Sequence, residues 1–243
     1  MKICVLASGS SGNSTYLESK DTSVLIDAGI SSKRIVDSLE KIGRDISEID
    51  GVFISHEHID HINGLQRLCD KYNVPVYMNK STFDNSGLNI DPTFFNKEVK
   101  LNELNIKPIP VSHDAADPCG FRIQSNGTVL GIFTDLGMVN DSIKQVTKEA
   151  DCMFIESNHD IDMLINGRYP YHLKERILSQ KGHLSNVDAG LLIKENSCDK
   201  LKTVFLAHLS KNNNTEKLAF ETFSVLTKKK PLIAKNTTNL VKI

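Results

Sequence analysis

The chain has 243 residues, of which 40% are hydrophobic and 24% are charged. This composition is typical of a soluble globular protein and excludes a disordered chain, while the length allows one large domain or two small ones. The 29 basic and 30 acidic residues leave a net charge of −1, so contact with a polyanion such as nucleic acid must come from a local patch. We expect a single domain that spans residues 1–243.

The sequence predicts neither a membrane segment nor a disulfide framework. It contains no run of about 18 apolar residues, which a membrane-spanning helix needs. The apolar run Ile3–Ala7 is shorter than the roughly 7–15 residues of a signal-peptide core. The cysteines are odd in number and form no CxxC pair, which indicates reduced thiols. They are Cys4, Cys69, Cys119, Cys152 and Cys198. We therefore expect a cytoplasmic protein that does not bind membranes.

The first third of the chain alternates short strands with helices. Apolar runs bounded by glycine, serine or asparagine predict strands. These are Lys2–Ala7, Thr15–Glu18, Ser23–Asp27, Ile49–Ser55 and Val74–Met78. Apolar residues at helical spacing predict two helices, Ser32–Ile42 and Asn63–Tyr72. The turn Ser8–Ser14 lacks the lysine of a phosphate loop, so we expect it to line the rim of a site.

The rest of the chain continues this alternation. An extended stretch is predicted over Val99–Val111, where Pro108 and Pro110 exclude a helix. Further strands are predicted at Phe121–Gln124, Val129–Thr134, Cys152–Glu156 and Thr203–Leu209. Helices are predicted at Ser142–Ala150, Leu173–Ser179, Val187–Asn196 and Thr215–Leu226. Strands and helices in both halves favour an α/β (α+β) fold of two packed sheets with helices outside.

The strongest signal for chemistry is the segment HEHIDH at residues 56–61, which directly follows a predicted strand. On an extended chain His56 and His58 point the same way. One turn into the following helix, Asp60 and His61 address a second point nearby. Imidazole and carboxylate groups are ligands of zinc and related divalent metals. A polar loop with chance histidines is the alternative, yet three of the eight histidines lie within six positions.

Three further candidate ligands follow predicted strands elsewhere in the chain. They are His113, Asp135 and His208. Taken alone, each could be a hydrogen-bonded structural residue at the end of a strand. Their shared position at strand ends, together with the HEHIDH segment, favours a metal site that draws ligands from the whole chain.

These residues resemble the five-motif signature of the metallo-β-lactamase superfamily, with Asp27 in SVLIDAG as the first motif. Longer stretches resemble the YycJ/WalJ (VicX) family of bacterial metallohydrolases, from Met1 to about Leu218. These stretches are SGSSGNS, SHEHIDHINGL, SHDAADPCGF, TDLG, ESNHDIDML, INGRYPYHLKERILSQKGHLSN and LAHLS. The resemblance implies a metallo-β-lactamase-like four-layer αββα sandwich with the site at one edge, between the sheets.

The resemblance also implies two divalent metal ions, either Zn²⁺, Mn²⁺ or Fe²⁺. The first ion would be held by His56, His58 and His113, and the second by Asp60, His61 and His208. Asp135 would bridge both ions. Such a pair can activate water and clamp the attacking and leaving oxygens of a phosphoester.

Glu156 and His183 form a second candidate pair, similar to the glutamate and histidine that assist the leaving group in tRNase Z-type enzymes. The alternative is that Glu156 orients a ligand and His183 caps the next helix. We take Asp60, Glu156 and His183 as the candidate catalytic residues. His159 could lie behind the ligands or on an exposed loop, and His172 is expected to be structural.

The segment Ile165–His183 is the most basic part of this otherwise neutral chain. Arg168, Lys174 and Arg176 lie in it beside two tyrosines and a single acidic residue, Glu175. This pattern predicts contacts with a phosphate backbone and with stacked bases. The alternative is a solvated helix face with packed tyrosines.

The predicted function is a dinuclear metal-dependent phosphodiesterase that cleaves DNA or RNA. The YycJ/WalJ resemblance favours an exonuclease, and the chain has no room for a β-CASP insertion or a tRNase Z arm. One alternative is a small-molecule hydrolase on the same scaffold, such as a cyclic phosphodiesterase or a thioesterase. The other is a regulatory metal-binding protein, which the complete set of candidate ligands disfavours.

Overall fold

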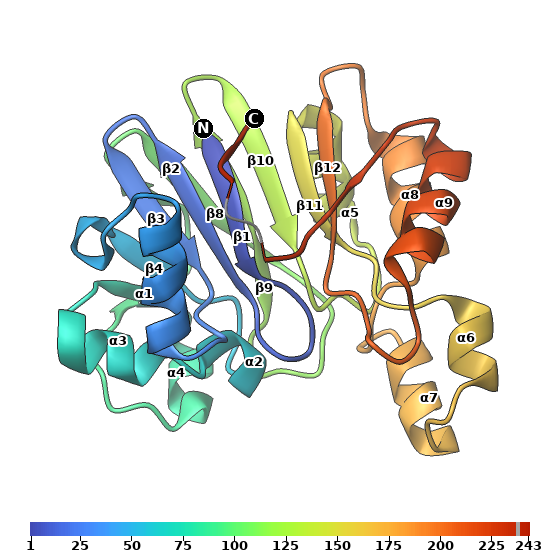
Figure 1. The fold of residues 1–243 in the computed structure, drawn as a ribbon, viewed down its shortest axis with the longest axis horizontal. Coiled ribbons are helices and arrows are strands. Elements are labelled where there is room, and N and C mark those ends of the chain that lie inside the picture. The colour runs from blue at the N-terminus through green and yellow to red at the C-terminus, as the bar shows by residue number, and fades with distance from the viewer. Residues whose placement is uncertain (237–238) are drawn as a thin grey trace.

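Two seven-stranded sheets form the centre of the computed structural model, which describes residues 1–236 and 239–243 (Figure 1). Sheet A has the order β14-β1-β2-β3-β4-β5-β6. Its strands are β1 (Lys2–Ala7), β2 (Ser14–Ser19), β3 (Thr22–Ile26), β4 (Gly51–Phe53), β5 (Val76–Met78), β6 (Thr93–Phe94) and β14 (Val241–Lys242). Strands β1 to β3 are antiparallel, and β3 to β6 are parallel.

Sheet B has the order β13-β12-β11-β10-β9-β8-β7. Its strands are β7 (Val99–Leu101), β8 (Leu104–Pro110), β9 (Cys119–Ser125), β10 (Thr128–Phe133), β11 (Cys152–Glu156), β12 (Thr203–Ala207) and β13 (Leu232–Ile233). Strands β10 to β13 are parallel, whereas β7 to β10 are antiparallel. In each sheet the carboxyl ends of several parallel strands therefore lie at the same edge.

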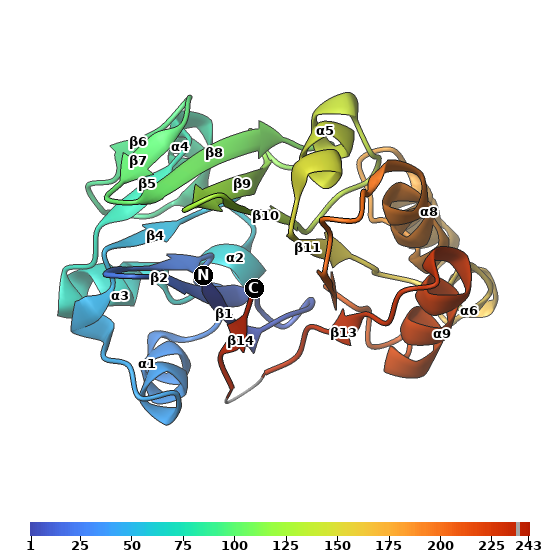
Figure 2. The same ribbon diagram turned by 90° about the horizontal axis from the view of Figure 1, so that it is seen from above.

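Helices cover the outer face of each sheet (Figure 2). Those near sheet A are α1 (Ser32–Lys41), η1 (Ile46–Glu48), α2 (Ile59–Ile62), α3 (Leu65–Tyr72) and α4 (Lys80–Ser86). Those near sheet B are α5 (Asp141–Glu149), α6 (Ile161–Asn166), α7 (Tyr171–Leu178), α8 (Asn186–Asn196) and α9 (Glu216–Thr227). Helices α6 and α7 project from the body beside the lower end of sheet B, and we call residues 161–178 the α6–α7 arm (Figure 1).

Three apolar clusters hold the four layers together. The central one lies between the sheets, where Phe53 of sheet A meets the ring of Phe121 of sheet B edge to face at 6.2 Å. A second cluster packs α1 and α3 against sheet A, and a third packs α5, α8 and α9 against sheet B. Since each sheet buries apolar residues on both faces, the predicted αββα sandwich is confirmed.

The local predictions fail mainly where elements are short. The stretch Val99–Val111 is a hairpin, β7 and β8, which turns at Asn102 with φ of 50°. The predicted helix Asn63–Tyr72 begins only at Leu65, after the separate four-residue helix α2. Some short elements, of two to seven residues, were not predicted, because such short runs show little periodicity. They are η1, α4, α6, β6, β13 and β14. Within the described residues, no helix is long and apolar enough to span a membrane.

Candidate metal centre

The predicted ligands meet at the edge where strands of both sheets end. His56 and His58 follow β4, and α2 carries Asp60 and His61. From sheet B, the side chains of His113, Asp135 and His208 follow β8, β10 and β12 respectively. Four overlapping groups of these side chains, with Glu156 and His183, place candidate ligand atoms within 4.8 Å of one another.

Left-handed backbone occurs at three strand ends around the centre. Asp27, Asp135 and His208 have φ of 60°, 55° and 54°. Residues other than glycine rarely adopt this conformation, which costs roughly 1–2 kcal/mol. Such strain persists where the surrounding structure fixes it. Here all three strained residues lie at strand ends beside the metal centre.

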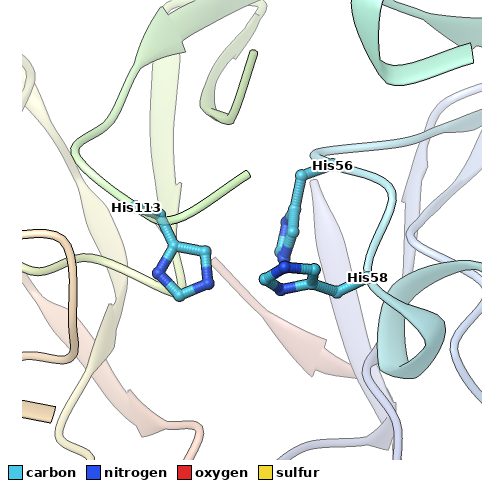
Figure 3. A group of neighbouring side chains, drawn as sticks. All are labelled: His56, His58 and His113. Atoms are coloured by element: carbon cyan, nitrogen blue, oxygen red, sulfur yellow. The ribbon is translucent and has the colours of Figure 1, made fainter. Parts of the chain in front are cut away.

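The first group of possible ligands is His56, His58 and His113, which converge from the two sheets (Figure 3). His113 donates from Nδ1 to the carbonyl oxygen of Gly182 at 3.2 Å, so its Nε2 keeps a lone pair. His56 contacts the hydroxyl of Ser55 through Nδ1 at 3.0 Å. The Nε2 of His56 is buried without a hydrogen-bond partner. This is the state of a nitrogen placed to bind a cation.

The second group is Asp60, His61 and His208. The ring Nδ1 of His61 lies 2.8 Å from Oδ2 of Asp27, and the ring Nδ1 of His208 lies 2.8 Å from Oε1 of Glu156. Each carboxylate fixes the tautomer of its histidine and leaves Nε2 for a ligand. The two Nε2 atoms lie 3.7 Å and 3.6 Å from Oδ2 of Asp60.

Asp135 connects the two groups. It belongs to one set with His56 and His61, and to another with Glu156, His183 and His208. Its Oδ2 lies 2.9 Å from Nε2 of His61, yet this oxygen is buried and makes no hydrogen bond. A carboxylate shared in this way can contact two cations at once.

Buried carboxylates dominate the electrostatics. Burial lowers the pKa of His61, but Asp135 and Asp27 outweigh it and raise that pKa to about 10. Burial raises the pKa of Asp135, yet His208 and His61 hold it well below its usual range. For His56, burial and the neighbouring histidines hold the pKa well below its ordinary value. The centre therefore stabilises ionised carboxylates and draws positive charge toward them.

The side chains present fit divalent metal ions. Imidazole nitrogens and carboxylate oxygens suit Zn²⁺, Mn²⁺ and Fe²⁺. The buried atoms His56 Nε2, Asp135 Oδ2 and His208 Nε2 make no hydrogen bond, although burial of an unpaired polar atom is costly. A cation among them would remove this cost, and the cluster thus indicates a site for divalent metal ions.

Glu156 and His183 lie together, as predicted. Oε1 of Glu156 accepts hydrogen bonds from Nδ1 of His183 and Nδ1 of His208, each at 2.8 Å. Its Oε2 accepts from the backbone N–H groups of Leu136 and Leu184 at 2.8 Å and 3.1 Å. Burial raises the pKa of Glu156, but His183 and His208 lower it to about 2. An ionised, fully bonded Glu156 orients two histidines, which agrees with the alternative role considered for it.

This chain is similar to known proteins over most of its length. A model of the beta-lactamase superfamily domain matches residues 22–203. The exodeoxyribonuclease YycJ of Bacillus anthracis is 40% identical over 88% of this chain and 84% of its own length. The exodeoxyribonuclease WalJ of Streptococcus pneumoniae D39 is 38% identical over 91% and 86%. The chain belongs to the YycJ/WalJ family of the metallo-β-lactamase superfamily.

A solved structure extends the likeness to the whole fold of this YycJ/WalJ-family chain. The crystal structure of the metallo-β-lactamase fold protein YhfI from Bacillus subtilis aligns with a TM-score of 0.76. It covers 99% of this chain and 98% of YhfI at 17% identity. At that identity the match supports the fold, and the sequence relatives establish the family.

The YycJ/WalJ-family chain also uses residues that sequence reasoning did not single out. The side chain of Asn13 accepts from the N–H of Gly9 and places Nδ2 3.0 Å from Nε2 of His61. Asn214 donates from Nδ2 to Ser157 O, Asn158 O and Asn186 Oδ1 at 2.8, 3.1 and 2.9 Å. In the NNN run at residues 212–214, only burial distinguishes Asn213 and Asn214 from the exposed Asn212.

The basic segment lies on the α6–α7 arm and is only partly directed at the centre. Arg176 lines a cavity beside His183, and its Nε lies 2.6 Å from Oδ2 of Asp114. Lys174 donates to the carbonyl oxygen of Ile165, and Arg168 is exposed. Of the two uncertain histidines, His159 is buried and His172 is exposed on α7.

Proposed function

We propose that this protein is a nuclease that hydrolyses phosphodiester bonds with two divalent metal ions. The observation that carries the proposal is the position of Asp135 between two groups of ligands, with His183 beside them in a cavity wall. The family relatives named exodeoxyribonucleases support DNA as substrate and exonucleolytic cleavage. We assign His56, His58 and His113 to one ion, Asp60, His61 and His208 to the other, and Asp135 to both.

The bound ions would lower the pKa of water and neutralise charge on the phosphate. Zn²⁺, Mn²⁺ and Fe²⁺ are the candidates, because all accept nitrogen and oxygen ligands. The protein's part is to fix the ligands before the substrate arrives. Asp27 and Glu156 do this through the Nδ1 atoms of His61 and His208.

His183 is the proton donor in this proposal. Its Nδ1 is bonded to Glu156, which leaves Nε2 to face a leaving group. Burial lowers the pKa of His183, but Glu156 outweighs it and raises the pKa above the ordinary value. As water forms a bond to phosphorus it loses a proton to the solvent, the bond to the leaving oxygen breaks, and Nε2 of His183 gives its proton to that oxygen. Glu156 acts through His183 as a positioning residue.

A cytoplasmic location accompanies this proposal, because DNA and RNA are available there. Among the described residues, no two cysteines form a disulfide. Reduced cysteines are usual in that compartment.

The test is a time-resolved gel assay with 5′-labelled single- and double-stranded DNA and RNA. The metal-stripped protein is supplied with Mn²⁺ or Zn²⁺, and Asp60→Ala is purified in parallel to control for contaminating nuclease. We expect metal-dependent cleavage that the variant lacks. No cleavage of any polymer by protein that holds two metal ions would contradict the proposal and favour a small phosphodiester or thioester substrate.

The basic segment is tested separately through binding. We expect Lys174→Glu to weaken nucleic-acid binding and to flatten its salt dependence by about one unit for a lost phosphate contact, and Arg176→Glu to have a smaller effect because Arg176 is paired with Asp114. Exposed Lys20, on the turn between β2 and β3, supplies the matched control Lys20→Glu. If affinity and salt slope are unchanged in the arm variants, the segment is a solvated helix face.

A further inference from the structure

A cavity of about 150 Å³ opens beside the metal centre, between the α6–α7 arm and two loops of the sheets. The arm contributes Tyr169, Leu173, Arg176 and Ile177 to its wall. Ser10, after β1, and Ser210, after β12, contribute to its wall from the two loops. The arm thus contributes aromatic, apolar and cationic side chains, and the two loops contribute hydroxyl groups.

The position of His183 determines which part of a substrate this cavity receives. His183 and His208 both line it, and the bond from His183 to Glu156 uses the Nδ1 atom. In the proposed function His183 faces the leaving oxygen, so the cavity that His183 and His208 line adjoins that oxygen. That oxygen belongs to the leaving group, so the nucleotide residue on the leaving side lies in the cavity.

Charge disfavours a phosphate group as the occupant. Arg176 is the cationic side chain of the arm that lines the cavity, and Asp114 already neutralises it through contacts of 2.6 Å at Nε and 2.5 Å at Nη2. A phosphate would need to break this ion pair. A nucleoside matches better, because its base can stack on Tyr169 and its sugar can bond to the serine hydroxyls.

The size of the cavity and the bonds that hold its walls together limit the occupant to one nucleotide residue of the substrate. Drug-sized ligands need roughly 300 Å³ or more, so about 150 Å³ leaves no room for more than one nucleoside. Two bonds tie the arm to the sheet loops: Arg176 binds Asp114, and Asn212 donates from Nδ2 to the Tyr169 hydroxyl at 3.0 Å. These bonds keep the arm close to the body of the protein.

We propose that this cavity seats a single terminal nucleoside on the leaving side, with Tyr169 as its wall, so that nucleotides leave one at a time. The proposal rests on the proposed nuclease function. It assigns product length to the contact between Tyr169 and Asn212, which are 43 positions apart in the chain.

The experiment measures product length by mass spectrometry after brief digestion of a mixed-sequence oligodeoxynucleotide. We expect the wild-type metal-loaded protein to release mononucleotides. Tyr169→Phe and Asn212→Ala remove the same hydrogen bond from opposite ends and should raise the fraction of longer products by roughly threefold to tenfold. Tyr171→Ala is the matched control, because Tyr171 is 75% exposed and does not line the cavity.

A binding measurement completes the test. We expect Tyr169→Ala to weaken binding of deoxyadenosine, measured by equilibrium dialysis, by roughly fivefold or more. Release of oligonucleotides by the wild type, or unchanged product length in both bond-removing variants, would overturn the proposal. Hydrolysis of bis(4-nitrophenyl) phosphate, a small diester, separates the two failures. If the metal-loaded protein does not hydrolyse it, the proposed function fails. If nucleoside binding is unchanged in Tyr169→Ala, the cavity assignment fails.

Discussion

The two sheets supply the metal centre in different ways. On the side of sheet A, four candidate ligands lie within residues 56–61, so the local chain fixes their spacing. On the side of sheet B, His113, Asp135 and His208 come from three separate strand ends, up to 95 positions apart. Their spacing depends on how β8, β10 and β12 pack within one sheet.

The two sides also hold their ligands by different means. Asp27, at the end of the adjacent strand β3, bonds to both His61 and Ser55. On the other side, buried Glu156 bonds to His183 and His208, and the asparagine network around Asn214 lies beneath the same loops. Sheet B's ligands thus depend on buried polar groups that are distant in sequence. Substitution of residues that are not themselves metal ligands should therefore displace the ligands of sheet B.

The largest effect is expected where the two sides meet. Asp135→Asn removes the charge that both ligand groups share, and we expect metal content to fall and kcat/KM to drop at least about a hundredfold. Metal analysis and steady-state kinetics measure this. Asp141→Asn is the control, because its carboxylate is 97% exposed. Normal activity with full metal occupancy would contradict the bridging assignment.

Loss of the proton donor should separate chemistry from metal binding. We expect His183→Asn to lower kcat by about 10²–10⁴ while metal content stays normal, because His183 contributes general acid catalysis in the proposed mechanism. His172→Asn, on the exposed face of α7, should behave as wild type. If His183→Asn instead loses metal, His183 is a metal ligand from sheet B and not the proton donor.

Asp27 tests how strongly sheet A's side depends on an orienting carboxylate. Asparagine tolerates the left-handed backbone at φ of 60°, so Asp27→Asn removes charge with little strain. We expect metal affinity to fall about 10–100-fold, measured by competition with a chelating dye. Asp37→Asn, in an exposed pair with Lys33, is the control. Unchanged affinity would show that the HEHIDH segment alone positions His61.

The smallest effect on activity is expected from the network beneath sheet B's ligands. Asn214→Ala leaves buried acceptors unpaired. We therefore expect the free energy of unfolding, measured in urea, to fall by about 1–3 kcal/mol. Activity should fall only a few fold, through displacement of His208. Exposed Asn166→Ala provides the comparison. Wild-type stability in Asn214→Ala would mean that the network is dispensable.

The same unfolding curves test the prediction that residues 1–243 form one domain. We propose that both sheets unfold together, because the central cluster contains apolar residues of each. Circular dichroism and tyrosine fluorescence should then report one coincident transition. Two separated transitions would contradict this and divide the molecule along its two sheets.

Much of the chemistry was determined by the sequence alone. Residue type at a strand end is a local property, and HEHIDH, His113, Asp135 and His208 could be proposed as ligands before any fold was known. The αββα sandwich required the family resemblance, since strand and helix order alone allowed other arrangements. Glu156 and His183 could be paired by resemblance, but not assigned as positioning residue and donor.

Only the tertiary structure decided the contacts between distant residues. The left-handed backbone of Asp27, the bonds of Asn13 and Asn214, and the ion pair of Asp114 with Arg176 have no signal in the local sequence. The physical reason is that hydrogen bonding and burial depend on which groups the packed sheets bring together. Side-chain chemistry can be read from the sequence, whereas orientation and charge neutralisation arise only when the chain folds.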